Sequence, residues 1–356
     1  MGVKLTYCCY KGQAGLDDLY QEWASLAEVK ATHFLHFPGW YSAELARRGC
    51  DKNIFFIAAR AQDKLVAILP FELIQQPIFL FKLPLLQLFY TNEMGVNDIF
   101  SVIELVEYFD EITLFMRREL PFFILVKWQC VLSDGVAASL GAAFRLSHSS
   151  KYLDLSSGVD AFWERYSSKF IKGLSKKRRK AEASGSLRLD VVTEPARLGA
   201  AFDAFLALEN SGWKGAEGTS ILKQPAKMQY YKSLLESYGG SGCCQINLLW
   251  LNDSPIAAQF AIVANRTLYL LKIGFDEAFS DVSPGYLILE RLIEAQKESG
   301  LINKISFVTG VNWIDRWKPL DQPVGVFYSS NGSWWGRATI GVIYSGVMQG
   351  VLARRR

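Results

Sequence analysis

The helices and strands that the sequence predicts follow one order twice along the chain. By hydrophobic spacing, the first half has helices at 17–30, 38–48 and 101–120 and strands at 54–59, 64–73 and 121–132. After KYLDLSSG at 151–158, the second half has helices at 160–183, 196–213, 224–238 and 286–299, strands at 187–194 and 304–310, and three more strands between 245 and 277. Strands that alternate with helices predict an α/β or α+β fold, with mixed sheets flanked by helices.

The length of the chain favours more than one core. With 356 residues, the chain exceeds the size at which single cores usually stop growing. We predict an N-terminal domain at 1–155, a C-terminal domain at 156–330 and an amphipathic tail at 331–356. The tail contains a Trp pair and ends in three arginines, so we expect a helix that rests at a membrane interface or docks on the second domain.

Composition and missing motifs exclude several classes of protein. Half of the residues are hydrophobic, which is typical of a globular chain, and a net charge of +4 gives no global field for nucleic acid. The sequence has no P-loop, no dinucleotide-binding glycine motif and no Ser-His-Asp order. His33 and His36 lack acidic or Cys partners nearby in the sequence, so no metal site is predicted. Because the first ten residues lack an apolar signal segment, we expect a cytoplasmic protein, with the inner face of the membrane as a further option.

One strand, loop and helix carry the strongest site signal, in LYLLKIGFDEAFSDVSPGYLI at 268–288. Alternation along the strand predicts that Leu268, Leu270, Lys272, Gly274 and Asp276 share one side. Pro284 restricts Ser283 to extended geometry, and Gly285 lets a partner approach the backbone. A helix that begins near Tyr286 directs unpaired N–H groups beyond the strand tip, which suits a phosphate or an oxyanion. An ordinary strand-to-helix connection capped by Ser283 is the alternative.

A second signal is the basic run RYSSKFIKGLSKKRRK at 165–180, which holds eight cationic side chains and no acid. Lys176, Lys177, Arg178 and Arg179 are candidate anion-binding residues. Like charges at this density repel one another, so phosphates of a donor, a membrane surface or RNA would relieve them. A solvated helix face is the alternative, and RNA ranks last because no RNA-reading aromatic motif accompanies the run.

These segments together resemble a known family. ALENSGWKGAEGTSIL at 207–222, the strand, loop and helix at 268–288, LSKKRRKAEASG at 174–185 and FLHFPGWYSAELARR at 34–48 are similar to the CelD or BcsL family of GNAT-type acetyltransferases. This family is related to FemAB-like aminoacyl transferases and linked to bacterial cellulose and exopolysaccharide production. The resemblance implies two GNAT-like folds in tandem, with the acyl-transfer site in the second. It also implies a splayed strand notch, followed by a loop that cradles the pyrophosphate of acetyl-CoA.

The strand pattern and the resemblance together suggest roles for individual residues. Asp276 would be the catalytic base, because it lies at the strand tip on the same side as Lys272, its partner, with Glu277 and Glu209 in reserve. Donor-binding residues would be Gly274, Ser283, Gly285 and Tyr286, and substrate-binding residues would be Trp213, Lys214 and Glu209. A structural Lys272–Asp276 pair and a core role for Trp213 are the alternatives. The loop departs from the usual Q/R-x-x-G-x-G/A cradle because it has one Gly and no Arg or Gln at its start, so another thioester or an aminoacyl donor stays open.

The expected function is direct acyl transfer. We expect a GNAT acyltransferase that moves an acetyl or other acyl group, not an aminoacyl group, from acyl-CoA to an amine or hydroxyl of a sugar, glycolipid or polysaccharide precursor. No activated Ser or Cys indicates a covalent intermediate. The alternatives are FemAB-like transfer from aminoacyl-tRNA and a noncatalytic adaptor of a polysaccharide synthase complex at the membrane.

Overall fold

The computed structural model describes residues 3–49, 52–78, 81–91, 95–141, 144–310 and 312–344. The first half contains β1 (Leu5–Lys11), α1 (Gly12–Lys30), η1 (Phe34–His36), α2 (Pro38–Arg48), β2 (Ile54–Ala61), β3 (Lys64–Ile78), β4 (Phe81–Leu88), β5 (Phe100–Ser101), η2 (Leu105–Tyr108), α3 (Phe109–Glu119), β6 (Leu125–Leu132), η3 (Val136–Leu140) and β7 (Arg145–Asp154). The order of helices and strands expected from the sequence is present in this half.

The second half repeats that order. It contains α4 (Val159–Glu164), α5 (Ser168–Glu182), β8 (Leu187–Val192), α6 (Pro195–Ser211), α7 (Trp213–Ala216), η4 (Ile221–Lys223), α8 (Pro225–Gly240), β9 (Cys244–Leu251), β10 (Ser254–Ala264), β11 (Thr267–Phe275), η5 (Glu277–Val282), α9 (Pro284–Ser299), β12 (Lys304–Ser306), η6 (Asn312–Trp317), β13 (Leu320–Ser330) and α10 (Trp334–Tyr344). Local signals explain many of the boundaries. For example, α2 begins with Pro38 and ends before Gly49, which adopts the left-handed conformation at φ 62°.

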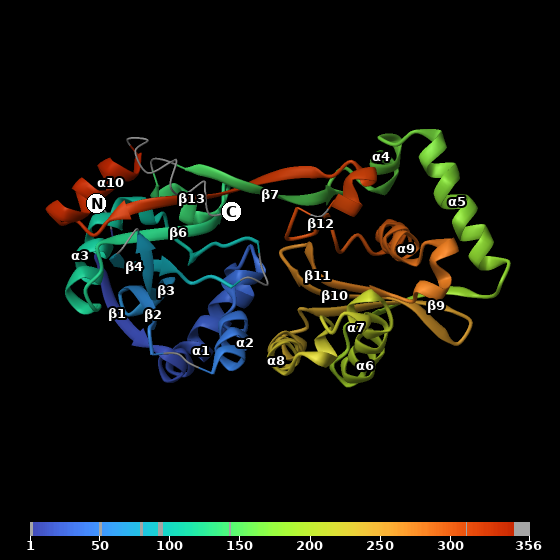
Figure 1. Cartoon of the computed structure of the whole chain (residues 1–356), viewed down its shortest axis with the longest axis horizontal. Coiled ribbons are helices and arrows are strands. Elements are labelled where there is room, and N and C mark those ends of the chain that lie inside the picture. Colours follow the sequence, from blue (N-terminus) through green and yellow to red (C-terminus); the bar gives the residue numbers. More distant parts are fainter. Residues whose placement is uncertain are drawn as a thin grey trace.

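Within the described residues, the strands form one mixed sheet. Its order is β1-β2-β3-β4-β6-β13-β7-β12-β11-β10-β9-β8, and β5 pairs only with β3. Figure 1 shows β7 and β13 side by side along the top of the molecule, where they join the two halves. The late strand β13 pairs with β6 of the first half, and the early β7 pairs with β12 of the second. Each half therefore lends a strand to the junction.

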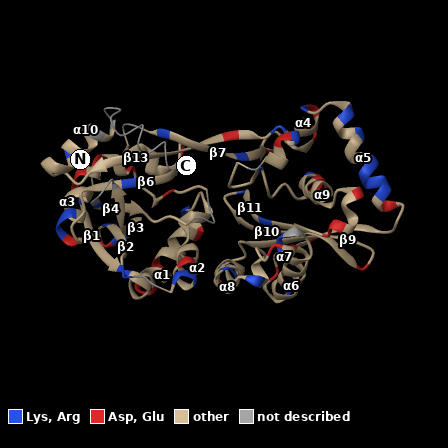
Figure 2. Cartoon of the chain, viewed as in Figure 1, with Lys and Arg blue, Asp and Glu red and all other residues tan. Residues whose placement is uncertain are grey.

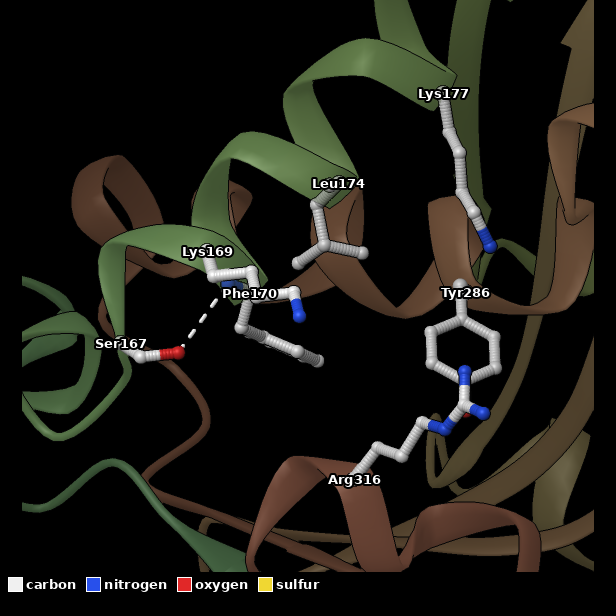
Figure 3. Close-up of a pocket in the computed structure, with 8 residues that line it drawn as sticks. Ser167, Lys169, Phe170, Leu174, Lys177, Tyr286 and Arg316 are labelled. Carbon is white, nitrogen blue, oxygen red and sulfur yellow. Dashed lines mark hydrogen bonds between the residues drawn. The ribbon is translucent and has the colours of Figure 1, made fainter.

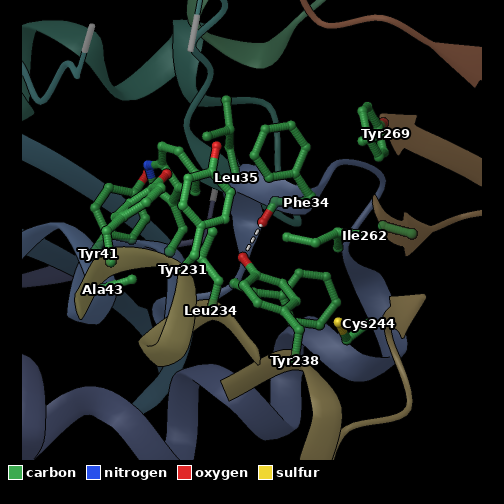
Figure 4. Packing of buried hydrophobic residues seen from close by; sticks show 14 of the residues in the cluster. Phe34, Leu35, Tyr41, Ala43, Tyr231, Leu234, Tyr238, Cys244, Ile262 and Tyr269 are labelled. Carbon is green, nitrogen blue, oxygen red and sulfur yellow. Dashed lines mark hydrogen bonds between the residues drawn. The ribbon is translucent and has the colours of Figure 1, made fainter. Parts of the chain in front are cut away.

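Helices cover both faces of this sheet. α1, α2, α6 and α8 share a core that runs through both halves, α3 covers the opposite face of the first half, and α4, α5 and α9 cover the opposite face of the second. Aromatic packing joins α2 to α8, since the Trp40 and Tyr230 ring centroids lie 5.4 Å apart. Tyr238 Oη donates to Phe34 O at 2.8 Å across the same contact (Figure 4). This shared core fixes the first half against the helices of the second.

The structure differs from the sequence prediction at several places. The strands β1, β4, β5, β7 and β13 were not predicted. Prolines interrupt the apolar pattern of β4 and β13, polar residues interrupt that of β7, and β5 has only two residues. The predicted helix at 160–183 is two helices, since Ser167 caps a new helix by accepting from Phe170 N. The helix predicted at 101–120 is shorter, because the η2 turn precedes α3.

The C-terminal helix docks on the opposite half from the one expected. Ile343 of α10 is buried with Leu85 and Leu125 of the first half, and Ile343 O accepts from Arg145 at 3.0 Å. The reason is that β13 inserts beside β6 and carries the chain end there. Trp334 and Trp335 stay about two-thirds exposed, at 68% and 69%. Residues 345–356 of the predicted tail lie outside the described residues, and the division at residue 155 remains a prediction.

Candidate acyl-transfer site

A β-bulge changes which side chains of β11 share a face. Ala261 pairs with Leu270 and Phe260 with Lys272, so Leu271 is the extra residue. Leu268 and Leu270 pack in the core beneath α9, whereas a side chain at Gly274 would point toward α6. The prediction that Leu268 and Leu270 share a side with Lys272 and Gly274 is therefore wrong, because the bulge breaks the two-residue period between them.

Beyond the bulge, one edge of β11 is open. β11 pairs with β10 as far as Phe275, but its parallel pairing with β12 covers only Thr267 to Tyr269. We call the gap beyond Tyr269 the notch. Asp276 N–H bonds to Ile256 O toward β10, so alternation turns the backbone groups of Ile273 and Phe275 toward the notch. Two peptide groups therefore face a space that another strand would fill in a continuous sheet.

The loop after β11 ends in a strained turn at the start of α9. Ser283 adopts left-handed geometry at φ 53° and ψ 67°, which is unfavourable for a side chain other than Gly, Asn or Asp. The N–H groups of Tyr286 and Leu287 both bond to Ser283 O, and Pro284 has no N–H. In the described part of the chain, Gly285 N–H is therefore the one amide of this first turn left for another acceptor. The predicted cradle offers fewer amides than the helix start alone suggested.

A cavity of about 610 Å³ connects the notch to this helix start. The lining residues come from α6 and the turn after it, from the end of β11, from η5 and the first turn of α9, and from η6. They are Leu208, Glu209, Gly212, Lys214, Ile273, Gly274, Phe275, Glu277, Ser280, Ser283, Pro284, Gly285, Tyr286 and Trp313. The space is of the size that small-molecule sites commonly have.

A buried carboxylate of α6 and a half-buried amine of α7 form one wall of this cavity. Glu209 is 3% exposed, and its Oε2 accepts from Ile221 N at 2.9 Å. Lys214 Nζ lies 3.4 Å from Glu209 Oε1 and donates to Ile273 O at 3.1 Å. Burial lowers the pKa of Lys214, the negative charge of Glu209 opposes that effect, and the positive charge of Lys272 adds to it. A charged pair is thus held at the mouth of the notch.

Gly274 brings this wall close to the strand. A Cβ built on Gly274 would lie 2.8 Å from both Glu209 Cα and Glu209 N, which real structures do not tolerate. The glycine therefore permits the end of α6 to rest directly on β11. Sequence reasoning placed Gly274 in donor binding, and the structure adds a packing requirement that positions Glu209.

The structure brings together most of the predicted site residues. Gly274, Ser283, Gly285 and Tyr286 line one cavity with Glu209 and Lys214. Lys272 and Asp276 do not line it. Asp276 caps η5 instead, where its Oδ1 accepts from Ala278 N at 2.9 Å. Trp213 begins α7, and its side chain lies outside the described residues. The roles of all these residues remain predictions.

The basic helix α5 lies against α9, and only part of it reaches the loop. Lys177 Nζ donates to Ser283 Oγ at 2.6 Å, while Arg178 pairs with the buried Glu290 at 3.1 Å. Lys176 and Arg179 are exposed. In Figure 2 the ribbon of α5 is blue at several positions along its length, where Lys and Arg residues lie. The four predicted anion-binding residues thus separate into one at the donor loop, one in an ion pair and two facing solvent.

Trp313 was missed by sequence reasoning. It follows β12 in η6, lines the cavity, and accepts a hydrogen bond at its backbone O from Tyr286 Oη at 3.2 Å. The aromatic residue in the polar segment TGVNWIDRW after a strand was the available signal. His33 and His36 are buried, with exposed fractions of 8% and 1%. Among the described residues, no cluster of three or more His, Cys, Asp or Glu could hold a metal ion, and no helix is long and apolar enough to cross a bilayer.

Comparisons with known proteins give one family match and several proteins of similar fold. Residues 168–318 match the family described as Acetyltransferase (GNAT) domain. A structure titled FemX is similar with a TM-score of 0.56 at 12% identity, over 87% of this chain and 96% of that one. The C-terminal domain of a putative lysylphosphatidylglycerol synthetase from Agrobacterium fabrum gives 0.54 at 10% identity, over 94% and 97%.

A third structure, L-PGS from Bacillus licheniformis, gives a TM-score of 0.50 at 12% identity, over 94% of this chain and 97% of that one. A sequence search of curated proteins finds no match. At these identities the structural neighbours establish the fold alone. The predicted fold class, mixed α/β sheets with GNAT-like architecture, is confirmed, and residues 168–318 of the second half match a GNAT acetyltransferase domain.

Proposed function

We propose that this chain is an acyltransferase whose activated donor lies in the cavity between β11, α6 and α9. The observation that carries this proposal is the open edge of β11 beside a helix start that has no acid in its first turn. The carrier group would lie against Ser283 and Gly285, where the free amide and the helix dipole favour negative charge. Its carbonyl would then reach the notch.

In the proposed reaction, the acceptor attacks the carbonyl directly. Glu209 would take the proton from the attacking amine or hydroxyl, since its carboxylate is held in place by Ile221 N–H and Lys214. The Phe275 N–H and the Lys214 ammonium would stabilise the oxyanion that forms as the acceptor bonds to carbon. The oxyanion then collapses and the bond between the carbonyl carbon and the carrier breaks, so that the carrier leaves as a thiolate or, for an ester donor, as an alcohol that takes the proton from Glu209. This assignment moves the base from Asp276 to one of its reserves, since Asp276 is outside the cavity lining.

We further propose an acyl-CoA, acetyl-CoA among them, as donor and a sugar, glycolipid or polysaccharide precursor as acceptor. The CelD or BcsL resemblance motivates both. Trp313 and Tyr286 supply aromatic surface beside polar groups, which is how sugar rings are commonly held. Trp213 and Lys214 stay candidate acceptor contacts. Location in the cytoplasm or at the inner membrane face, and a place in a synthase complex, belong to the same proposal.

The second candidate is aminoacyl transfer from charged tRNA. Two carboxylates, Glu209 and Glu277, line the cavity and would attract the α-ammonium of an aminoacyl group. The similar fold of FemX and of the lysylphosphatidylglycerol synthetase domain supports the same candidate. We therefore do not restrict the proposed transfer to groups other than aminoacyl groups.

Calorimetric titration separates these candidates. We expect acetyl-CoA or a longer acyl-CoA to bind, and Gly285→Val to weaken binding by about tenfold or more, because its branched side chain fills the carrier position. Gly285→Ala is the matched control, since a Cβ there would meet only Phe275 Cδ1 at 3.9 Å. Binding of aminoacyl-tRNA alone would select the second candidate.

Absence of binding by either donor would overturn acyl transfer. In that case the adaptor alternative predicts that loss of residues 334–356 removes function while Gly285→Val does not.

A further inference from the structure

A second cavity, of about 310 Å³, lies between α5, the first turn of α9 and η6. We call it the α5 pocket. Its lining consists of Ser167, Lys169, Phe170, Gly173, Leu174, Lys177, Tyr286 and Arg316. Tyr286 also lines the larger cavity, and the other seven residues do not. Figure 3 shows Lys177 and Arg316 reaching toward Tyr286 from opposite elements, with Phe170 and Leu174 on the α5 side.

The charge of the α5 pocket is unbalanced. Its lining includes Lys169, Lys177 and Arg316 and no acidic residue. Among the described residues, the exposed side chains of Lys169 and Arg316 have no hydrogen bond or ion pair, and the half-buried Lys177 donates its side-chain hydrogen bond to the neutral Ser283 hydroxyl. Burial and the positive charge of Arg316 lower the pKa of Lys177. Three cations therefore face a space in which an anion would relieve their repulsion.

The same helix shows what balanced charges look like. Arg178 pairs with Glu290 at 3.1 Å, and Lys180 pairs with Asp281 at 2.6 Å. These pairs lie outside the α5 pocket. Lys172, Lys176 and Arg179 are exposed cations of α5 outside the pocket. What distinguishes Lys169, Lys177 and Arg316 is therefore that they border one cavity, and not that they lack an ion pair.

Gly173 gives an independent indication of a ligand. It lies inside α5, where a glycine costs about 0.5–1 kcal/mol relative to alanine. Its φ is not positive, and a Cβ built on it would meet nothing within 4 Å. Neither the backbone nor the packing of the chain requires a glycine here. Its effect is to leave an open surface between Phe170 and Lys177 in the pocket wall.

We propose that the α5 pocket binds a nucleotide phosphate, with the phosphate among Lys169, Lys177 and Arg316 and the flat base on Phe170 and Leu174 beside Gly173. The three cations would bind the phosphate, and the apolar surface of Phe170 and Leu174 would pack against a planar group joined to it. The nucleotide has two possible sources, which are the distal end of the donor in the neighbouring cavity and a separate nucleotide. The binding step itself does not depend on acyl transfer.

The test uses adenosine 3′,5′-bisphosphate as the probe and calorimetry on the full chain. We expect the wild type to bind it and Arg316→Gln to weaken binding by about tenfold or more, as loss of a charged contact does. Lys172→Gln is the matched control, since Lys172 is an exposed lysine of α5 outside the pocket. We expect its affinity to stay near that of the wild type.

Gly173→Ala gives a result that a structural role cannot mimic. We expect weaker probe binding with an unchanged or raised melting temperature, because alanine favours the helix while its methyl group narrows the pocket. Gly199→Ala is the control, since Gly199 is also inside a helix with nothing within 4 Å of a built Cβ, and it lies outside both cavities. No probe binding by the wild type, or equal binding by Gly173→Ala and the wild type, overturns the proposal.

Competition identifies the source of the nucleotide. If acetyl-CoA displaces the probe, and Gly285→Val weakens the binding of acetyl-CoA but not the binding of the probe, the α5 pocket holds the distal end of the donor. If both bind together, the nucleotide is separate. Probe binding without binding of any acyl donor would leave the α5 pocket supported while the proposed acyl-CoA donor fails, so the two proposals are distinguishable.

Discussion

The two halves of the molecule share one order of elements and differ at the notch. In the first half β4 and β6 pair in parallel over three positions, and in the second half β11 and β12 do the same. The first gap is filled by the chain itself, because Asn97 O accepts from Leu132 N on β6 and Asn97 Nδ2 donates to Phe89 O after β4. The second gap opens into the cavity of about 610 Å³.

The helix starts differ in the same sense. The first turn of α3 contains Asp110 and Glu111, so its own acids lie at the positive end of the helix. The first turn of α9 has no acid. Two halves with the same fold therefore need not share the same site. In the first half, residues of the chain fill the gap between the parallel strands and acids lie at the helix start. In the second half, both places are left for a ligand.

The largest expected effect is on transfer in the open half. Glu209→Gln should lower the rate of acyl transfer by about 10²-fold or more, because a glutamine cannot accept the proton. Thiol release from the acyl donor in the presence of amine and sugar acceptors measures this rate. Glu290→Gln is the control, since Glu290 is also a buried carboxylate paired with a cation, and it lies outside the cavity. Equal losses in both variants would exclude a specific role for Glu209.

A smaller effect should come from the glycine that seats α6 on the notch strand. Gly274→Ala should lower the free energy of unfolding by about 1–3 kcal/mol, because the added methyl group overlaps the Glu209 backbone. Chemical denaturation measures this change, and Gly285→Ala serves as the tolerant glycine of the same cavity. A stability equal to that of the wild type would show that α6 does not rest on Gly274.

The filled notch can be weakened in turn. Asn97→Ala removes the bond to Phe89 O and the side-chain acceptor of Asp98 N. We expect a loss of about 1–2 kcal/mol in the free energy of unfolding, since buried backbone groups lose their partners. Donor affinity should not change. Loss of donor binding without loss of stability would indicate that a ligand binds in the first half. It would contradict the conclusion that the two halves differ at the notch.

The smallest effect concerns the contact between the two halves at His33 and Tyr269, which we call the seam. His33 is buried, its ring centroid lies 4.5 Å from that of Tyr269 on β11, and burial holds its pKa well below the ordinary value. As pH falls below about 6.5, the unfolded chain gains a proton at His33 before the folded chain does. The free energy of unfolding should therefore fall, by at most about 1.4 kcal/mol per pH unit from this residue.

Denaturation between neutral pH and about pH 5 measures that slope, with the wild type and His33→Asn compared under equal conditions. An asparagine can still accept the hydrogen bond from Leu35 N that His33 Nδ1 accepts at 3.2 Å. The variant should show the shallower slope. Equal slopes would mean that His33 does not couple pH to the stability of the seam.

Much of the local structure was readable from the sequence. The helix at 38–48 was predicted with the bounds of α2, because its apolar spacing lies between a proline and a glycine that fix its ends. The meander β9, β10 and β11 was predicted because turns at Asn252 and Asn265 tolerate the left-handed backbone they adopt. Ser283, Gly285 and Tyr286 were singled out as site candidates from local signals too, and that role stays a prediction. The expectation that Pro284 holds Ser283 in extended geometry is wrong, because Ser283 is left-handed at φ 53°.

Contacts between distant segments were not readable in this way. The bulge at Leu271 breaks alternation without any proline or glycine at that position. Glu209 was ranked below Asp276 as a base, because only the approach of α6 to Gly274 turns it into a cavity wall. The α5 pocket brings together Lys177 and Arg316, which lie far apart in the sequence. No local pattern at either residue predicts that the other is its neighbour.

The sequence by itself determined most of the helices, the β2–β3 hairpin and the β9–β11 meander, because spacing, caps and left-handed turn residues act within a few positions. Only the tertiary structure decided that β13 enters the sheet between β6 and β7, that the first notch is filled and that the second is open. The physical reason is that strand pairing and helix packing satisfy backbone groups and bury side chains between segments far apart in the chain, where no local preference reaches.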